Sequence, residues 1–539
     1  MNNNDPFATA SSPDDAALKV VLMRYWEEQK QMEERSEDIL RFRKKRAARL
    51  RRQNNAVAST RALPPEVLSL IFSYARGDPI SNPTCQQDLV RLGHICSKWR
   101  NILLLVPRLW SRFTLTIKLQ SGKQHGLQLL ELYLNNTRDS PFSLCISFPR
   151  VYPAYNGLAG QIFQALQRHV SKVHTLKIEC VPWAWVPWLS WFSSVGALEI
   201  SNVVMPPAPD VSLSFIRFTR LYRLELSGSP CLRGVQLPWT QITSLTLKSM
   251  PIDLCMSLLL QCPNLTEFHT LSSRRRIENF ALMPQIPDHT IQVEQLEHLS
   301  WSYEPDSTCS SYYDRLQFPS LHSLCWYSPS YRRAPSATGE LYALRSLATR
   351  FPPTISQIRL FCVGSWPNDL TELLFDNSKN LQIIHFFKCS YSFVIDALPL
   401  LNRTDAQGRH IFPKLVEILI QDPEARSPNS SSRVLLEAEL ASRVTQMVRA
   451  RDPNKTKDFS LQLVQTSGLT SKEMREAYIS LKRDGHAFNV WVDTARVNSF
   501  QCVLDRERRV KAKEEIPFVD SESQLVQDLE DSGSWIVQR

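Results

Sequence analysis

Apolar residues recur at helical spacing in a short stretch that begins soon after residue 60. Five residues carry this pattern: Leu63, Val67, Leu68, Ile71 and Phe72. Pro64 and Pro65 stand where the first turn of a helix would lie, and a missing N–H costs nothing there. A second group repeats the pattern: Leu89, Leu92, Ile95, Cys96 and Trp99. The spacing predicts two short amphipathic helices, and a small helical core with no further role is the simplest interpretation.

A longer helix is predicted upstream, from Asp14 to Asp38. One row of residues spaced seven apart is apolar: Leu18, Tyr25, Met32 and Ile39. The complementary row is mostly polar: Leu22, Gln29, Ser36 and Arg43. Because only half of this seam is apolar, we expect no stable two-stranded coiled coil from the helix alone, and we expect it to lean on the neighbouring helices or on a partner. We expect residues 1–16 to be disordered and the link Gln53–Ser59 to be mobile, since they are polar or small.

From residue 173 onward the pattern L-x-x-L-x-L, with apolar substitutions, occurs ten times. The repeats begin at Val173, Val195, Leu221, Ile242, Leu265, Leu296, Leu321, Ile355, Leu381 and Leu415. Their mean spacing is roughly 27 residues, close to the period of leucine-rich repeats, and insertions such as Tyr303–Gln317 and Ser328–Glu340 make the intervals uneven. A generic β-rich domain could also produce alternating apolar residues, but ten repeats separated by helical segments favour a stacked solenoid.

Each repeat places its fourth and sixth residues on one face of a short strand, and only the neighbouring repeats can cover that face. The residue between them is then expected to face solvent on the inner surface. Read along the chain, this row is Lys177, Glu199, Glu225, Thr246, His269, Ser300, Cys325, Arg359, His385 and Leu419. The row is chemically mixed and holds no catalytic set, so we interpret it as a surface that reads a protein substrate. The candidate contacts are Lys177, Glu199, Glu225, Arg359 and His385.

Four tryptophans lie between the first two repeats. They are Trp183, Trp185, Trp188 and Trp191, spaced by Pro182 and Pro187. Tryptophan in a loop stiffened by proline is a typical binding hot spot. Packing of these rings into the core beneath a long loop is the alternative interpretation.

The charge of the chain is concentrated in one segment. The formal net charge is +10, and eight basic residues with no acid lie between Arg41 and Arg52, so the rest of the chain carries only about +2. This distribution argues against a nucleic-acid surface that covers the whole protein. The basic run could be a nuclear import signal, a contact for RNA or phosphate, or simply the solvated flank of a helix.

Known catalytic and metal-binding motifs are absent from the sequence. There is no P-loop, nucleophile elbow or H-E-x-x-H, and the twelve cysteines form no C-x-x-C pair. His322 with Cys325, and His385 with Cys389, could suggest metal ligands, but each cysteine falls in or beside a strand pattern where a small buried residue is ordinary. We therefore expect no catalytic residue, metal or cofactor. The start of the chain lacks the pattern of a signal peptide and no apolar run is long enough to cross a bilayer, so we expect a cytoplasmic or nuclear protein with no membrane partner.

Residues 61–114 resemble the F-box, a three-helix adaptor module. The resemblance is carried by the Leu63-Pro64 start with Glu66 two places on, by Ile95-Cys96-Ser97-Lys98-Trp99-Arg100, and by the closing Leu109-Trp110. The connection Gly77–Asp88 is longer than in the compact family pattern, and surface loops tolerate such insertions. The resemblance implies that the module docks on a Skp-type adaptor of a cullin–RING ubiquitin ligase. The residues implied as adaptor contacts are Leu63, Pro64, Leu68, Ile71, Leu92 and Cys96, with Trp99 and Trp110 as internal packing.

The whole chain then resembles F-box proteins with degenerate leucine-rich repeats, of the type abundant in fungi. The predicted class is α/β, with an N-terminal helix and F-box-like module, an irregular horseshoe solenoid and a C-terminal cap. The predicted domains are residues 1–16 (disordered), 17–60 (charged helix), 61–114 (F-box-like), 115–425 (solenoid), 426–505 (cap) and 506–539 (charged, mobile tail). The implied function is substrate recognition in the ligase, without catalysis. The alternatives are a leucine-rich-repeat scaffold without ligase association, or a nuclear RNA- or chromatin-associated protein that uses the basic run.

Overall fold

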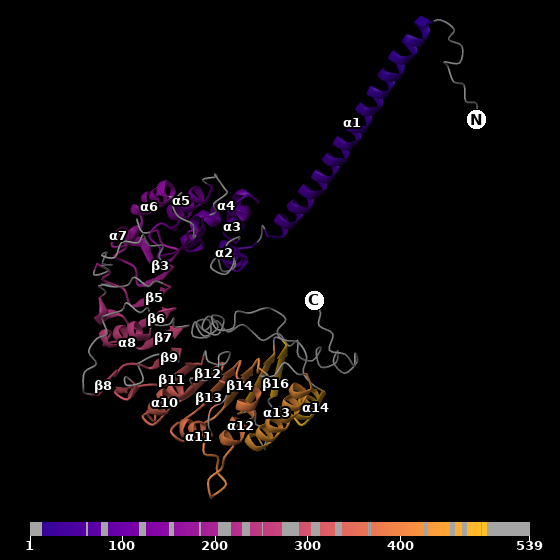
Figure 1. Ribbon diagram of the computed structural model, residues 1–539. Coiled ribbons are helices and arrows are strands. Elements are labelled where there is room, and N and C mark those ends of the chain that lie inside the picture. Colours follow the sequence, from indigo (N-terminus) through magenta and orange to yellow (C-terminus); the bar gives the residue numbers. More distant parts are fainter. Residues whose placement is uncertain are drawn as a thin grey trace. The chain divides into compact units, whose positions relative to one another are not determined.

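The computed structural model describes most of the chain in two compact units (Figure 1). The described residues are 13–60, 63–76, 85–117, 125–149, 156–182, 185–202, 217–228, 238–250, 252–271, 290–302, 313–328, 337–364, 366, 368–424, 430–452, 459–465, 472–486 and 488–492. The first unit comprises residues 1–116 and 123–144, and the second comprises residues 117–122 and 145–539. The predicted tail 506–539, residues 1–12 of the segment predicted to be disordered, most of the Gly77–Asp88 connection and Trp183 lie outside the described residues.

The first unit begins with helix α1 (Pro13–Thr60), which contains the predicted helix and extends it in the C-terminal direction. The expectations of a mobile link at Gln53–Ser59 and of disorder at residues 13–16 were wrong, because both segments belong to the helix. The reason lies in composition, since no glycine or proline occurs between Asp14 and Thr60 to end the helix. Of the two alternatives expected for α1, packing on the neighbouring helices is not seen, since from Ala17 to Leu50 every described side chain except that of Lys19 is exposed. Packing on a partner stays a prediction.

Four short helical segments follow: α2 (Pro65–Ala75), α3 (Cys85–Gly93), α4 (Ser97–Leu105) and the 3-10 turn η1 (Pro107–Trp110). Their common core is made of fully or nearly fully buried apolar residues: Leu68, Phe72, Leu89, Ile102, Leu103 and Leu109. The alternating apolar residues predict two strands here, and the structure has both, β1 (Arg112–Thr116) and β2 (Phe142–Ser147). The two strands are neighbours in the sheet.

Helix α5 (His125–Thr137) completes this core and was not predicted. Its Tyr133 is fully buried against Trp110 and Phe113, with ring centroids 4.9 Å and 4.8 Å apart, and its hydroxyl donates to the Gln86 carbonyl over 3.1 Å. The Thr137 hydroxyl donates to the Trp110 carbonyl over 2.8 Å. The compact unit therefore extends beyond the three predicted helices to include α5 and the strands beside it.

The second unit is built on a parallel sheet in which sequential strands are neighbours. Its strands are β3 (Val173–Glu179), β4 (Ala197–Ser201), β5 (Arg223–Ser227), β6 (Ser244–Lys248), β7 (Glu267–Leu271), β9 (His298–Ser302), β11 (Ser323–Tyr327), β12 (Gln357–Phe361), β13 (Ile383–Phe387), β14 (Glu417–Gln421), β15 (Ser460–Gln465) and β16 (Phe488–Val492). The two short strands β8 (Ile291–Gln292) and β10 (Leu316–Gln317) form a separate pair. Each of the ten predicted repeats supplies one strand from β3 to β14. Strands β15 and β16, which the sequence assigned to a cap, continue the same sheet.

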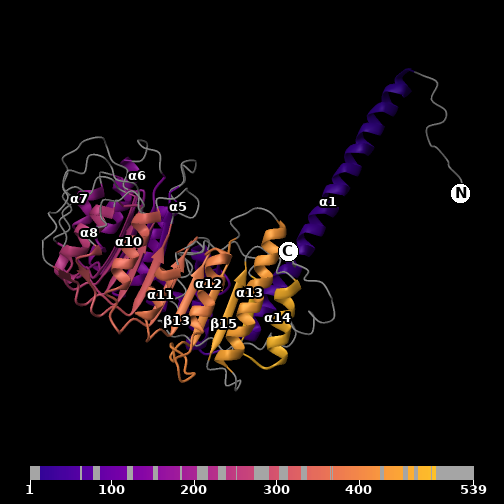
Figure 2. The same ribbon diagram turned by 60° about the horizontal axis from the view of Figure 1, so that its bottom comes forward.

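Helices connect the strands of this sheet. They are α6 (Asn156–Gln167), η2 (Val170–Lys172), α7 (Val186–Leu189), η4 (Trp239–Gln241), α8 (Ile252–Gln261), α10 (Ala337–Ala348), α11 (Asn368–Asp376), α12 (Tyr391–Leu401), α13 (Ser430–Arg451) and α14 (Lys472–Arg483). From β11 onward each pair of consecutive strands is joined by one of the helices α10 to α14, and these helices follow one another along one side of the sheet (Figure 2). The core lies between these helices and the sheet. For example, the rings of Phe386 in β13 and Phe393 in α12 have centroids 6.0 Å apart.

The register of the sheet is the one that the repeat predicts. Leu176 pairs with Leu198, which pairs with Leu224, which pairs with Leu245, and the fourth residue of every later repeat continues this ladder. These residues and almost all of the sixth-position residues are buried. A slip of one residue would turn the apolar set to the opposite face, so burial of this set fixes the register.

A sharp turn recurs directly after the strands. The residue that follows the strand has a φ between 48° and 74° at seven positions: Cys180, Asn202, Gly228, Ser249, Cys362, Lys388 and Asp422. Each of these residues donates its backbone N–H to a carbonyl at the end of the next strand, over 2.7–2.9 Å. Only one of the seven is a glycine, so six side chains accept a left-handed conformation that costs about 1–2 kcal/mol each. The same backbone unit is therefore imposed on unrelated residues by the stacking of the strands.

Candidate functional site

Helix α2 has two faces with different environments. Pro64 precedes the helix and Pro65 opens it, with Glu66 in the first turn where a carboxylate complements the helix dipole. On the inner face, Leu68 and Phe72 are fully buried, and the Phe72 ring lies 5.0 Å from the ring of Trp99 in α4. This face attaches α2 to the other two helices.

The outer face of α2 carries an apolar stripe that the described part of the chain leaves exposed. It consists of Val67, Leu70, Ile71 and Tyr74, which are 39%, 51%, 42% and 79% exposed. Their spacing of three, four and seven positions puts all four on one side of a helix. Adjacent apolar side chains that stay in water mark a docking surface. We refer to these four residues as the α2 stripe.

The structure divides the predicted adaptor contacts between surface and core. Pro64 and Ile71 are exposed, while Leu63, Leu92 and Cys96 are half-buried. Leu68 is a correction: its side chain is fully buried among the helices, so it holds the module together and has no surface to offer a partner. Cys96 also has a local role, because its sulfur caps α4 by accepting the Trp99 N–H over 3.5 Å.

Three members of the α2 stripe were not among the adaptor contacts predicted from the sequence: Val67, Leu70 and Tyr74. Nearly every side of α2 is apolar, so helical periodicity alone does not tell which face turns inward. The spacing of Val67, Leu70, Ile71 and Tyr74 was the signal that could have found the stripe.

Internal contacts hold the helices in register behind this stripe. The Trp110 side chain is 3% exposed and its indole N–H donates to the Leu103 carbonyl over 2.8 Å. The buried Arg76 guanidinium, at the end of α2, donates to the Arg112 carbonyl over 2.6 Å. Lys98 Nζ donates to the Leu63 carbonyl over 3.1 Å and so ties the start of α2 to α4. Trp99 and Trp110 thus have the packing role that the sequence predicted.

Comparison with known families finds a match in this region. Residues 60–116 match the family model of F-box-like domains. The chain contains an F-box-like domain. Domains of this family typically bind Skp-type adaptors and in general belong to ubiquitin-ligase substrate receptors rather than to catalysts. A search of curated proteins finds no match to the chain.

Outside the F-box-like domain, the parallel sheet aligns the predicted inner row. Lys177 pairs in register with Glu199, Glu199 with Glu225, and the ladder continues to Arg359, His385 and Leu419. All of these residues lie on the face of the sheet opposite to the buried fourth and sixth positions. We refer to this ladder as the inner row.

The inner row begins with a network of charges. Lys177 Nζ lies 2.7 Å from Glu199 Oε1 and 3.4 Å from Glu179 Oε1, and Lys248 pairs with Glu225. Burial and the neighbouring Glu225 carboxylate raise the pKa of Glu199 above its ordinary value, against the effect of Lys177. Burial opposes the charge of Lys177, but the Glu199 and Glu179 carboxylates outweigh it and raise the pKa of the lysine. A partner that binds here has to compete with these internal ion pairs.

The inner row is less exposed than the sequence predicted. Four of its residues are buried: Glu225, Thr246, Ser300 and Cys325. Glu225 is 5% exposed, and its ion pair with Lys248 supplies the partner that a buried carboxylate needs. Strands only about 4.8 Å apart let long side chains cover their shorter neighbours.

The later part of the same face is aromatic. Cys325, Phe361 and Phe387 form a buried cluster, against which Tyr327 and Leu419 pack. The Phe361 and Phe387 rings are stacked, with centroids 4.3 Å apart and planes 12° from parallel. Arg359 Nη2 lies 3.2 Å from Gln357 Oε1, and His385 Nε2 lies 3.1 Å from Glu417 Oε1. One face of one sheet therefore combines a charged part with an aromatic part.

The tryptophans between the first two repeats divide between core and surface. Trp185 is fully buried and its indole N–H donates to the Ala159 carbonyl over 3.2 Å. Trp188 is half-buried and stacks on Phe163 with centroids 4.3 Å apart, while Trp191 is 49% exposed. Core packing is thus the correct interpretation for Trp185, and among the described tryptophans a binding role stays a hypothesis for Trp188 and Trp191.

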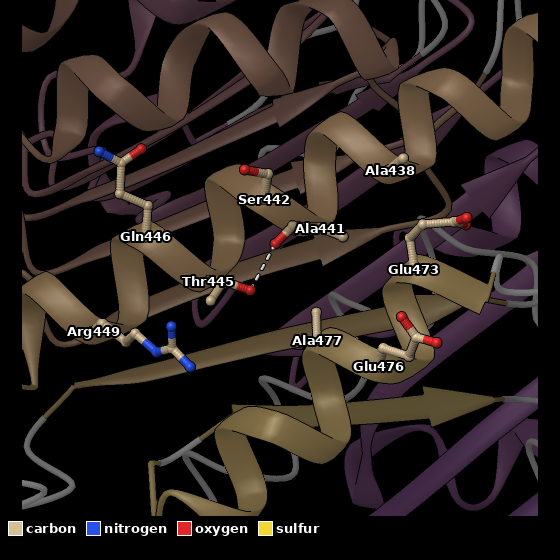
Figure 3. Close-up of a pocket in the computed structure, with 9 residues that line it drawn as sticks. All are labelled: Ala438, Ala441, Ser442, Thr445, Gln446, Arg449, Glu473, Glu476 and Ala477. Atoms are coloured by element: carbon tan, nitrogen blue, oxygen red, sulfur yellow. Dashed lines mark hydrogen bonds between the residues drawn. The ribbon is translucent and has the colours of Figure 1, made fainter.

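A pocket of about 550 Å³ lies between α13 and α14 (Figure 3). Its lining residues are Ala438, Ala441, Ser442, Thr445, Gln446, Arg449, Glu473, Glu476 and Ala477. Arg449 is already engaged, because Nη2 lies 3.0 Å from the Ser480 hydroxyl and 2.9 Å from Asp484 Oδ2. The Thr445 hydroxyl in this pocket donates to the Ala441 carbonyl over 2.8 Å. Among the described residues no cluster of three or more potential metal ligands occurs, and none of the described helices is long and apolar enough to span a membrane.

Proposed function

We propose that this protein is the substrate-recognition subunit of a Skp–cullin–F-box ubiquitin ligase. The observation that carries the proposal is the α2 stripe, four exposed apolar residues on the first helix of an F-box-like domain. In this arrangement the domain binds the adaptor, the adaptor links it to the cullin and RING subunits, and the parallel sheet binds a protein substrate. The chain itself performs no chemistry and acts by raising the local concentration of substrate near the charged ubiquitin carrier.

The energetics of the α2 stripe support adaptor binding. Burial of an apolar side chain of this size contributes roughly 1.5–3 kcal/mol, so partial burial of four of them supplies several kcal/mol toward the affinity. The F-box-like domain is also small, and a domain of this size gains stability from a partner that binds only its folded state. We assign the main adaptor contacts to Pro64, Ile71, Leu70 and Tyr74, with Leu63, Leu92 and Cys96 at the edge.

We further propose that the second unit is a degenerate leucine-rich-repeat solenoid. Three observations support this: the parallel register of the ten repeats, the left-handed residue that follows seven strands, and the helices that join consecutive strands along one side. In such a solenoid each repeat contacts only its neighbours, which leaves one strand face available over its whole length. The inner row would then be the substrate surface, with Lys177, Glu199, Glu225, Arg359 and His385 among its contacts.

A tagged full-length chain tests the ligase proposal in cell extract. The expected result is that the adaptor and the cullin co-purify with the chain, and that both are lost from a variant with Ile71→Asp and Tyr74→Asp. A second variant, Leu132→Asp, changes an exposed apolar residue of α5 outside the stripe and should retain both partners. If the wild-type chain is folded and yields neither the adaptor nor the cullin, the proposal fails and a scaffold without ligase association takes its place.

A further inference from the structure

Helix α1 exposes an apolar face along most of its 48 residues. The residues on this face are Leu18, Val21, Leu22, Tyr25, Met32, Ile39, Leu40 and Leu50, each at least 42% exposed. These eight recur at helical spacing and fall within one side of the helix, while four further exposed apolar residues, Val20, Met23, Trp26 and Phe42, lie outside it. Figure 1 shows α1 as a single uninterrupted helix. An exposed helix of this length with an apolar face offers a long surface to a partner, because packing of such a face adds to the stability of a helix.

The charges of α1 are divided sharply between its two halves. Residues 13–38 carry eight acidic and four basic side chains, a net charge of −4. Residues 39–60 carry eight basic side chains and no acidic one, a net charge of +8. Each half is more than about 30 Å long at 1.5 Å per residue, whereas the Debye length at physiological salt is about 8 Å. Each half therefore interacts with whatever lies beside it, independently of the other half.

Ion pairs within the helix leave these charges available to a partner. Arg24 lies 3.9 Å from Glu28, and Arg41 lies 3.2 Å from Glu37. All four side chains are at least 68% exposed, and exposed pairs of this kind contribute little. The apolar face is also interrupted by Gln29, Ser36 and Arg43, so it does not specify an orientation by itself. The charge pattern has to decide how a second helix lies against α1.

We propose that α1 binds α1 of a second copy of this chain, in antiparallel orientation. Antiparallel pairing sets the half with charge −4 against the half with charge +8 at both ends of the pair, and the two apolar faces cover each other. Parallel pairing would set +8 against +8, which opposes association. The helix is thus complementary to itself in one orientation only. This inference does not rest on the proposed ligase function, since α1 lies outside the residues 60–116 of the F-box-like domain.

The first test is the mass of the full-length chain in solution, measured by light scattering across a range of salt. The expected result is a dimer whose dissociation constant rises at least about tenfold between roughly 0.05 M and 0.5 M salt, because screening weakens the paired halves. A variant with Glu27, Glu28, Glu33 and Glu34 changed to Lys makes both halves positive and should be monomeric. Replacing Arg41, Arg43, Arg46 and Arg49 with Lys preserves every charge and should leave the dimer intact. A monomeric wild-type chain at low salt would overturn the proposal.

A charge exchange separates self-association from unfolding. A third variant, with Lys44, Lys45, Arg46 and Arg49 changed to Glu, removes the net positive charge of the second half and should also be monomeric. Mixed with the four-lysine variant, it should form a heterodimer, because the unchanged +8 half of the four-lysine variant can lie against the unchanged −4 half of the third variant. Lysine, glutamate and arginine have similar helix propensity, so circular dichroism should remain unchanged throughout. Failure of the mixture to associate, while each variant stays helical, would contradict charge complementarity.

The orientation is read by cross-linking. A photoreactive benzoylphenylalanine at Tyr25, which is 61% exposed on the apolar face, is combined with an isotope-labelled copy of the chain to identify links between molecules. The expected cross-links reach residues 39–60 of the other copy. Links to residues 13–38 would mean a parallel pair and overturn the proposal. Capture of a polyanion such as RNA by a chain that stays monomeric would also overturn it and assign the basic run to nucleic acid.

Discussion

The α2 stripe and the inner row are both surfaces that the fold turns outward, yet their chemistry differs. The α2 stripe is wholly apolar and has no internal partner among the described residues, whereas the inner row begins with Lys177, Glu199 and Glu225 in a network of ion pairs. The neighbouring buried positions do not differ in this way, since Phe72 behind the stripe and Leu224 beside Glu225 are both fully buried apolar residues. The two regions thus share the same kind of apolar core and differ only in the side chains at their surfaces.

This difference indicates different kinds of partner. An apolar stripe gains affinity from area alone and suits one constant partner that keeps it covered. In the inner row the charged side chains are already paired with one another. A ligand binds there only if it supplies matching charges, so the row discriminates between ligands. A substrate receptor needs both properties: a constant contact with its adaptor and a selective contact with its substrate. Four substitutions break or sharpen the comparison, beginning with the largest expected effect.

The largest effect should come from Leu224→Asp. This change places an ionised carboxylate inside the sheet core, where Leu224 is fully buried, and should lower the free energy of unfolding of the second unit by more than about 4 kcal/mol. Denaturant titration of the full chain measures it. Glu199→Gln, in the register position beside Glu225, is the control and should leave the unit folded. Similar destabilisation by both changes would mean that the two faces of the sheet are not distinct.

Phe72→Ala should have the next largest effect. It removes a fully buried ring that packs on Trp99 and should destabilise the first unit by about 3–5 kcal/mol. Ile71→Ala, one residue away on the exposed stripe, should change the unfolding free energy by less than about 0.5 kcal/mol. Thermal denaturation compares the pair. Equal losses of stability would place Ile71 in the core and remove the stripe as a surface.

Tyr133→Phe should cost about 1 kcal/mol, because it removes the hydrogen bond to the Gln86 carbonyl. Burial raises the pKa of Tyr133 to about 12 from the ordinary value of 10.0. Since the folded state holds this proton more tightly than the unfolded state, the advantage of the wild type over Phe should shrink as the pH rises from 10 toward 12. Unfolding of both proteins at pH 9 and at about 11 tests the sign. An advantage that grows with pH would contradict the burial of the hydroxyl.

Glu199→Gln should have the smallest effect, and its signature is a slope against pH. Burial and the Glu225 carboxylate raise the folded-state pKa of Glu199 above its ordinary value of 4.5. The folded state therefore binds this proton more tightly, and the stability of the wild type relative to Gln should fall as the pH rises above 4.5. Urea unfolding of both proteins from about pH 4.5 to 7.5 measures how the difference in stability depends on pH. The prediction is that this difference falls as the pH rises. A rising difference would mean that Lys177 dominates the environment of Glu199.

The parts of the molecule that sequence could predict are those in which one apolar period dominates. In most repeats the fourth and sixth positions are apolar and the residue between them is polar, so strand position and register both follow; the exceptions are Thr270 at a sixth position and Cys325 and Leu419 between the two. Helix α5 was missed because Leu129, Leu130, Leu132, Tyr133 and Leu134 form a nearly continuous apolar run, which has no helical period. Strand β15 was missed because Asp458 stands where the repeat needs an apolar residue.

The candidate site was predictable only in part for a related reason. The F-box-like pattern located the module and the packing of Trp99 and Trp110, but Leu68 and Leu70 are indistinguishable in sequence and lie on opposite faces of α2. Which face turns inward depends on contacts such as Phe72 with Trp99, and these join residues far apart in the chain. The burial of Glu225 likewise depends on Lys248 in the next strand.

The affinity of the purified full-length chain for a Skp-type adaptor, measured by calorimetry, tests the central claim most directly. The account predicts binding at micromolar concentration or tighter, and a loss of at least about a hundredfold when Ile71 and Tyr74 are both changed to Asp, since roughly 2.8 kcal/mol suffices for that factor. Leu132→Asp should bind like the wild type, and all three proteins should melt at similar temperatures. A folded wild-type chain that does not bind the adaptor, or one whose binding survives the double change in the α2 stripe, would contradict the account.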